Sequence, residues 1–559
     1  MKNNLILCFI FFSTIANSQI NINQSEKYKQ AGLVWGLLKY HHPEISKGKY
    51  NWDLEFIKLC GTIENIATQE QLNDVLLSFV TRFKGNISKK NKTKSNPNLF
   101  LKNVDYSWID TDVFGEGLTT ELSAIKDNTT IGDYYAASDK FSKIVSFKNE
   151  KGVNTFNSSE KSHRLLVLYS FWNVIQYWNV NKYLTDEKWI NVLNVLSDDF
   201  IKSKTALEFE IAKSKLITKI NDSHAFYCSQ IVNDSLLRYK PAFSVKRVND
   251  SLVVDGLINK QLCVKDNIEL GDVVTKINNK TVLDLQQEKL GPLLSVSNIN
   301  FFKKWGRWLL FSKNDTIEIE VLKKDGTALK KYVHLYDKYQ SSEPSFLNKK
   351  QTDKWNFIKP NIAYINLSEI TSKELSVVFK EISSTKGLIL DLRNYPKFIT
   401  EKDIPEFIYP QKKEFVKVLF PLQNSPSLGE YNGSAPLKII SDPFKAGKEN
   451  PDYYKGKVVL LVNHFTQSKA EYIGMAIQQA PNCITIGEQT AGSVMNIVSF
   501  MMPDTTEVNF TALGAFYPNG KEVQRNGLHI DHLIQESAKK YDYELYIKQA
   551  VRIIENNNN

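Results

Sequence analysis

Cysteine is scarce in this sequence, and the few cysteines present are not spaced as pairs. The chain has 559 residues and five cysteines, of which Cys8 lies in an apolar N-terminal segment. The others are scattered, with no Cys-x-x-Cys motif: Cys60, Cys228, Cys263 and Cys483. This pattern excludes a zinc ribbon and a disulfide-dense scaffold. We therefore expect mostly buried free thiols.

Long hydrophobic runs are also lacking after the first residues. The segment Met1–Ser18 has a lysine, an apolar core and a small-x-small ending at Ala16-Asn17-Ser18. These are the parts of a secretory signal, and the apolar core is too short to span a membrane as a stable helix. We expect a mature protein that begins near Gln19 and is exported to the periplasm, the cell envelope or the medium, without stable membrane insertion.

Dense charge of one sign is missing as well. The net charge of +10 is spread thinly, and no DNA- or RNA-binding motif accompanies it. The sequence therefore predicts no nucleic-acid partner. With 42% hydrophobic residues, a chain of this length can bury ample core and needs more than one domain.

The patterning changes along the chain and predicts a multidomain α/β protein. Residues 19–230 have mainly helical periodicity, including an apolar stretch at Leu165–Trp178 and a capping box at Thr205. Residues 241–337 contain short alternating strands. A polar linker at 338–354 precedes an α/β region at 355–545.

The most informative stretch is residues 457–492. An apolar run, Val458–Val462, predicts a strand buried on both faces, and a helix is expected over Ser468–Gln479. A second short strand at Cys483–Ile486 follows. This order places Ser468 at a helix start, where backbone N–H groups and the helix dipole can stabilise an oxyanion. Ser468-x-x-Glu471 is equally the pattern of an ordinary capping box, which is the structural alternative.

The stretch Ser468-Lys469-Ala470-Glu471 after VVLLVN, with IGEQTAG about twenty residues on, resembles the tail-specific (C-terminal processing) serine protease family. The resemblance implies that Ser468 is the nucleophile of a crotonase-like α/β domain, with the N–H of Lys469 in the oxyanion hole. It implies no metal or organic cofactor.

The motif Asp222-Ser223-His224-Ala225-Phe226 resembles the tricorn-like branch of that family. The resemblance makes His224 the general base and Ser223 the residue that orients it. A hydrogen-bonded core histidine is the structural alternative. His41 and His42, adjacent before a proline, have no spaced acidic partner and are expected to be structural or at the surface.

Three departures from the family pattern bear on this site. Lys397 and Phe398 stand where the family has glycines that help build the oxyanion hole. Gln524 stands where the tricorn-like branch has a glutamate, and we expect it to be a neutral partner of His224. Ser493 occupies the position of the base in lysine-type members, which disfavours a Ser-Lys dyad.

Residues 270–282 resemble the PDZ signature of glycine-aspartate, apolar strand, polar turn and strand, although an unrelated small β module is the alternative. The sequence thus predicts an exported serine peptidase that hydrolyses polypeptides through a Ser-His centre. Two other functions remain open. One is a peptide-binding protein that has lost catalysis. The other is an apolar-ligand-binding protein on the same fold, similar to the retinoid-binding modules of the eye.

Overall fold

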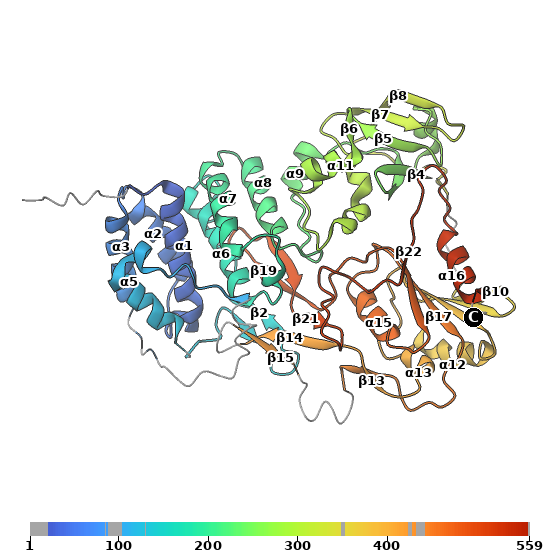
Figure 1. Cartoon of the computed structure of the whole chain (residues 1–559). Coiled ribbons are helices and arrows are strands. Elements are labelled where there is room, and N and C mark those ends of the chain that lie inside the picture. The colour runs from blue at the N-terminus through green and yellow to red at the C-terminus, as the bar shows by residue number, and fades with distance from the viewer. Residues whose placement is uncertain are drawn as a thin grey trace, which may run out of the picture.

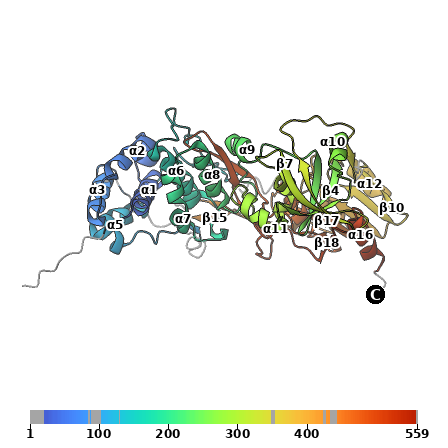
Figure 2. The same cartoon turned by 90° about the horizontal axis from the view of Figure 1, so that it is seen from above.

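Three regions make up the computed structural model, which describes residues 21–83, 85, 87, 103–128, 130–347, 353–422, 427–431 and 442–556. A helical N-terminal region lies at one end, and a β module and an α/β region lie together at the other (Figure 1). Figure 2 shows these regions from above. The multidomain α/β class expected from sequence is confirmed. The expected signal segment, residues 1–18, lies outside the described residues.

Two helices that are buried on nearly every side form the centre of the N-terminal region. They are α1 (Gln24–His41) and α6 (Lys161–Trp178), and every residue of the predicted segment 165–178 is buried. Such helices must be covered on all sides. The neighbouring elements are η1 (Ile45–Lys47), α2 (Trp52–Ile63), α3 (Gln69–Thr81), α5 (Thr111–Lys126), β1 (Ala137–Ser138), β2 (Val145–Ser146), η2 (Lys182–Leu184), α7 (Trp189–Lys202), α8 (Ala206–Thr218) and α9 (Gln230–Leu236).

The predicted capping box at Thr205 forms, with the Glu208 carboxylate accepting from the Thr205 N–H at 3.0 Å. It fixes the start of α8, which ends shortly before the loop that contains His224. Among the described residues, no helix is both long and apolar enough to cross a membrane.

The β module comprises residues 239–347 and contains one curved sheet in the order β3-β4-β5-β7-β8. Asn278 and Asn279 both have left-handed backbones (φ 49° and 63°), which suits the tight turn between β5 and β6. The elements are β3 (Phe243–Val248), β4 (Ser251–Leu257), α10 (Lys260–Lys265), β5 (Val273–Ile277), β6 (Lys280–Thr281), α11 (Val282–Leu285), η3 (Gln286–Leu290), η4 (Ile299–Leu310), β7 (Thr316–Leu322), β8 (Ala328–His334) and β9 (Ser345–Phe346).

The C-terminal region is organised by a sheet in the order β10-β11-β12-β17-β18-β22, parallel except at β10. Alternate residues of its strands pack on opposite faces, one under α16 and the other under α12 and α15. The predicted strand at 458–462 and the helix after it are confirmed. The elements are β10 (Trp355–Lys359), β11 (Ile362–Asn366), α12 (Ser372–Glu381), β12 (Gly387–Asp391), β17 (Lys457–Val462), α15 (Lys469–Ile477), β18 (Cys483–Gly487), β22 (His532–Leu533) and α16 (Leu545–Glu555).

One hairpin of the C-terminal region, β19 (Ile497–Met501) with β20 (Glu507–Thr511), reaches back to the N-terminal helices (Figure 1). Lys213 Nζ pairs with Asp504 at 2.5 Å, and Phe147 packs against two phenylalanines of the hairpin. The hairpin therefore delivers its last residue, Thr511, to the loop after α8. The other elements here are α13 (Pro405–Ile408), β13 (Lys413–Glu414), β14 (Lys417–Pro421), β15 (Leu428–Glu430), β16 (Lys445–Ala446) and β21 (Gly514–Phe516).

Candidate active site

Ser468 lies at the sharp turn between β17 and α15, with φ 59° and ψ −122°. A non-glycine residue rarely adopts a positive φ, so the turn is strained, and strain of this kind concentrates at functional sites. A strained serine between a buried strand and a helix is the arrangement of a nucleophile elbow. The capping box does not form, because the Ser468 side chain makes no capping hydrogen bond. The Ser468 hydroxyl is thus left available for chemistry.

Glu471 binds the loop 490–493 instead of capping the helix. Its carboxylate accepts hydrogen bonds from the Thr490 hydroxyl and from the N–H groups of Gly492 and Ser493, at 2.7 and 2.9 Å for the latter two. Gly492 has φ 67°, and a Cβ there would lie 2.7 Å from the Arg525 carbonyl oxygen. The loop in turn accepts the Ser468 N–H on the Ser493 carbonyl at 2.9 Å. Glu471 therefore supports the strained turn through this loop, and the Ser468 N–H also stabilises its carboxylate directly.

His224 is held by Thr511, at 2.9 Å from Nδ1 to Oγ1. The Thr511 hydroxyl donates to Asp222 Oδ1 at 3.0 Å, so its oxygen accepts the proton on His224 Nδ1. This leaves the lone pair of the neutral ring on Nε2, which is buried and has no hydrogen-bond partner among the described residues. Burial lowers the pKa of His224, the Asp222 carboxylate opposes that shift, and the Lys304 ammonium adds to it. His224 is thus a neutral imidazole with an unused acceptor.

Asp222 is the buried carboxylate behind this histidine. Its Oδ2 accepts from the Thr511 N–H at 2.6 Å, and its Oδ1 accepts from the His224 N–H at 3.0 Å and from the Ser493 hydroxyl. His224 Nδ1 lies 3.9 Å from Asp222 Oδ1, so the threonine hydroxyl mediates between them. Asp222 and Thr511 together place a negative charge behind the His224 ring. In the tricorn-like pattern a glutamate at the position of Gln524 would have this place.

The loops that contain Ser468 and His224, about 240 residues apart in sequence, are joined directly. Gln467 Nε2 donates to the Ser223 carbonyl at 3.1 Å. Ser493 binds both sides, through its carbonyl to Ser468 and through its hydroxyl to Asp222. The structure therefore brings the predicted nucleophile and base into one site. Within the described chain, no hydrogen bond links the Ser468 hydroxyl to His224.

Ser223 and Gln524 do not have the predicted contacts with the His224 ring. The Ser223 hydroxyl donates to the Ala491 carbonyl at 3.2 Å and accepts from the Ser297 N–H at 2.8 Å, so both of its bonding directions serve backbone groups. Gln524 is buried, and its Nε2 lies 3.4 Å from Thr511 Oγ1, one residue away from the ring. Thr511 is the residue that orients His224.

The predicted oxyanion residues lie together. Lys469 Nζ donates to the Lys397 carbonyl at 3.4 Å. A second hydrogen bond, from the Thr466 hydroxyl to the Leu392 carbonyl at 2.9 Å, joins the loop before α15 to the loop after β12. No residue in 391–398 has a positive φ, so this loop keeps its shape without glycine. The backbone N–H of Lys469 has no partner among the described residues, which makes it available to an oxyanion.

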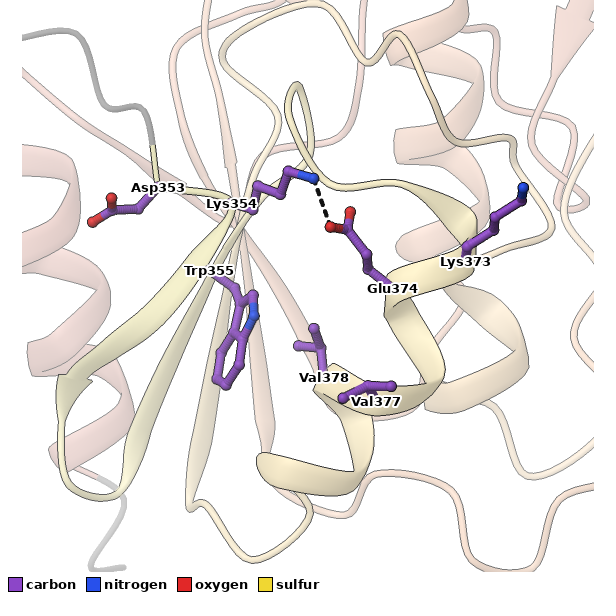
Figure 3. A pocket seen from close by; sticks show the side chains of 7 residues that line it. All are labelled: Asp353, Lys354, Trp355, Lys373, Glu374, Val377 and Val378. Carbon is purple, nitrogen blue, oxygen red and sulfur yellow. Dashed lines mark hydrogen bonds and ion pairs between the residues drawn. The ribbon is translucent and has the colours of Figure 1, made fainter.

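The other candidate sites of the described chain lie apart from the site of Ser468 and His224. His41 and His42 are buried and bonded to Tyr106 and to backbone carbonyls, so they are structural. Among the described residues no acid, histidine and cysteine cluster could hold a metal ion. A pocket of about 410 Å³ lies at the outer edge of the sheet, where Lys354 and Glu374 form an ion pair at 2.5 Å (Figure 3). None of the predicted site residues lines it.

Thr511 and Lys304 have no sequence signal of their own, and Asp222 was only part of a motif. Asp222 could have been singled out as the acid closest to His224 in the chain. Thr511 comes from a hairpin far along the sequence, and Lys304 comes from the β module. Only the tertiary structure brings these residues to the site.

Residues 361–534 match Peptidase family S41. The C-terminal region therefore contains an S41 domain. This domain places the protein among the serine peptidases, which are hydrolases. A comparison with curated protein sequences finds no match.

Two solved structures of the protein CPAF resemble this chain. Mature CPAF has a TM-score of 0.54 and 11% identity, over 70% of this chain and 98% of that chain. Mature CPAF complexed with lactacystin has a TM-score of 0.53 and 11% identity, over 70% and 97%. The photosystem II D1 C-terminal processing protease is also similar, with a TM-score of 0.37 and 14% identity over 70% and 97%. At this identity the CPAF likeness shows a shared fold.

Proposed function

We propose that this protein is an exported serine peptidase that hydrolyses peptide bonds in polypeptides, with Ser468 as nucleophile and His224 as general base. The observation that carries the proposal is the left-handed backbone of Ser468 at a strand-to-helix turn, with its hydroxyl unbonded within the described residues. A serine that merely capped α15 would have extended backbone angles and a bonded hydroxyl. The strained geometry has no such structural role.

The reaction proceeds in two steps. Ser468 Oγ attacks the peptide carbonyl carbon while His224 Nε2 accepts its proton, and the resulting imidazolium donates that proton to the leaving amine. A water then attacks the acyl carbon while His224 Nε2 accepts its proton. The bond from that carbon to Ser468 Oγ breaks, the imidazolium returns the proton to Oγ, and the acid product leaves. Throughout, the Nδ1–H of His224 stays on Thr511 Oγ1, and the buried Asp222 carboxylate stabilises the positive charge through that hydroxyl.

The tetrahedral intermediate needs donors for its oxyanion. The N–H of Lys469 at the start of α15 is the first, and the helix dipole adds to it. The loop that contains Lys397 forms the other side of the oxyanion hole. The Lys469 side chain donates a hydrogen bond to its backbone.

Export and peptide capture complete the proposal. The anatomy of Met1–Ser18 supports export, and sequencing of the N-terminus of protein from the producing cell tests it. An intact Met1 would contradict export. The β module has the edge strands β3 and β8, on which a PDZ-like domain could add an extended peptide. Deleting it should impair cleavage of long polypeptides more than of short reporters.

The catalytic assignment is tested by labelling with a serine-directed phosphonate and mapping the modified residue. We expect the label on Ser468, and we expect Ser468→Ala and His224→Ala each to remove nearly all turnover. The double variant should be little worse than either, because groups that act as a unit are non-additive. Ser499→Ala and His532→Ala, both exposed, are the matched controls. Retained turnover in folded His224→Ala would overturn the assignment.

A further inference from the structure

Lys304 comes from the β module and contacts the residue that precedes the candidate nucleophile. It belongs to η4, and its Nζ donates to Gln467 Oε1 at 3.2 Å. Gln467 directly precedes Ser468 and also binds the loop of His224. Lys304 is close enough for its charge to act on the His224 ring. A cation from a separate module therefore stands at the candidate catalytic centre.

No acid neutralises this cation within the described chain, whereas its neighbour Lys303 is paired with Glu488 at 2.8 Å. The Lys304 ammonium lies 5.0 Å from the Phe301 ring and 5.7 Å from the Trp305 ring. Burial lowers the pKa of Lys304. Its only hydrogen bond among the described residues is to a neutral amide, so it retains capacity for an anion.

Docking of the β module does not require Lys304. Neighbouring side chains of η4 and of the turn before it make that contact, since Asn298 donates to the Thr490 carbonyl at 2.9 Å and Asn300 to the Gln489 carbonyl at 2.7 Å. Beside Lys304, Trp305 stacks on Phe226 with ring centroids 5.0 Å apart and an interplanar angle of 1°. Phe226 is 44% exposed, so an apolar surface adjoins the unpaired charge.

We infer that Lys304 binds a carboxylate of the peptide substrate close to the scissile bond, with the Phe226–Trp305 pair as the adjoining surface. This inference rests on the proposed peptidase function and adds a substrate class to it, namely peptides with an acidic group near the cleavage site. An ammonium at hydrogen-bond distance favours a carboxylate over its neutral isostere. The carboxylate can come from an Asp or Glu side chain or from a free C-terminus.

The experiment compares kcat/KM for matched quenched-fluorescent peptides. One series exchanges Glu for Gln at each position flanking the cleaved bond, and the other compares a free C-terminal acid with its amide. We expect wild type to favour the acidic member of one series, which identifies the source. Lys304→Met should reduce that ratio about fivefold, Lys304→Arg should keep it, and Lys304→Glu should shift preference to a lysine-containing peptide. Lys313→Met, an exposed lysine of the same module, is the control.

An unchanged acid-to-neutral ratio in Lys304→Met would overturn the inference. If that unchanged ratio comes with an equal loss on every peptide, measured at a pH above the acid limb of His224, Lys304 belongs to the chemistry or to docking. Phosphonate labelling of wild type at Ser468 is measured in parallel. If it fails, the proposed function fails, whereas labelling with an unchanged ratio removes only the role of Lys304.

Discussion

Thr511 Oγ1 accepts a hydrogen bond from His224 Nδ1 across 2.9 Å. That one contact fixes the tautomer of the ring, because the threonine proton is already donated to Asp222. It also explains how the site can dispense with a glutamate at position 524. The carboxylate is supplied from the motif of His224 itself, one hydroxyl removed from the ring.

Thr511→Val should therefore lower kcat by about 10- to 100-fold, because valine keeps the shape of threonine but cannot accept from Nδ1. Thr511→Ser retains the hydroxyl and should preserve most of the turnover. The measurement is kcat for both variants, with circular dichroism to confirm folding. Wild-type kcat in Thr511→Val would show that the hydroxyl does not orient the base.

The pH dependence should report the surroundings of His224. Catalysis needs the neutral ring, so activity rises as pH increases through the pKa of His224. Burial lowers that pKa, which places the midpoint of the acid limb below about 6.5. Asp222 opposes the shift and Lys304 adds to it. Asp222→Asn should move the limb to lower pH, and Lys304→Met should move it to higher pH.

Profiles of kcat/KM against pH check these directions, and they do so even where the variants lose activity. Thr275→Val, a change in the β module away from the site, controls for general effects. An acid limb well above neutral pH, or one that neither charge variant moves, would show that His224 is not the group that titrates.

Sequence reasoning was sufficient for the strand, helix and strand at 457–487, because a buried parallel strand is a continuous apolar run and a helix start has local signals. The same local signals could not separate a capping serine from a nucleophile. Ser-x-x-Glu suits both, and only the backbone angles of Ser468 distinguish them. The resemblance to a known family, rather than periodicity, pointed to His224.

The supporting residues could not be predicted for a different reason. Thr511 reaches His224 only because the β19–β20 hairpin packs on the N-terminal helices, and Lys304 reaches Gln467 only because the β module docks there. Contacts between residues so far apart in sequence leave no periodic pattern. Ser223 was assigned by motif alone, and its hydroxyl serves backbone groups instead.

Gln524→Glu tests whether the site can accept the carboxylate that it lacks. Gln524 is buried beside Thr511, and its Oε1 has no partner among the described residues. A carboxylate there would be a second buried negative charge near Asp222, competing for one hydroxyl proton. We expect a loss of about 1–3 kcal/mol in stability at neutral pH, recovered as pH falls and the new carboxyl protonates.

The thermal midpoint at pH 5 and pH 7.5 measures this effect, with the exposed Gln535→Glu as the control. Combining Gln524→Glu with Asp222→Asn should restore part of the stability, since one charge is then removed. A single Gln524→Glu variant that is as stable as wild type and turns over faster would show that the position favours a charged partner.

Glu471 should make stability depend on pH. Burial raises its pKa to about 7, despite hydrogen bonds from Thr490, Ser493 and Gly492 that favour the ionised form. Because the folded pKa lies above the unfolded value, Glu471 in its protonated form stabilises the fold fully below about pH 4.5. This contribution to the free energy of unfolding is lost as pH rises towards 7. The shift corresponds to about 3 kcal/mol across that window.

Glu471→Gln cannot ionise, so its thermal midpoint should change less between pH 4.5 and 7 than that of wild type. Glu507→Gln, a change at the surface, is the control and should behave as wild type. Glutamine also replaces one acceptor oxygen by a donor facing the Ser493 N–H, so kcat should fall as the Ser468 turn loosens. An identical pH slope in Glu471→Gln and wild type would show that this carboxyl is not the group responsible.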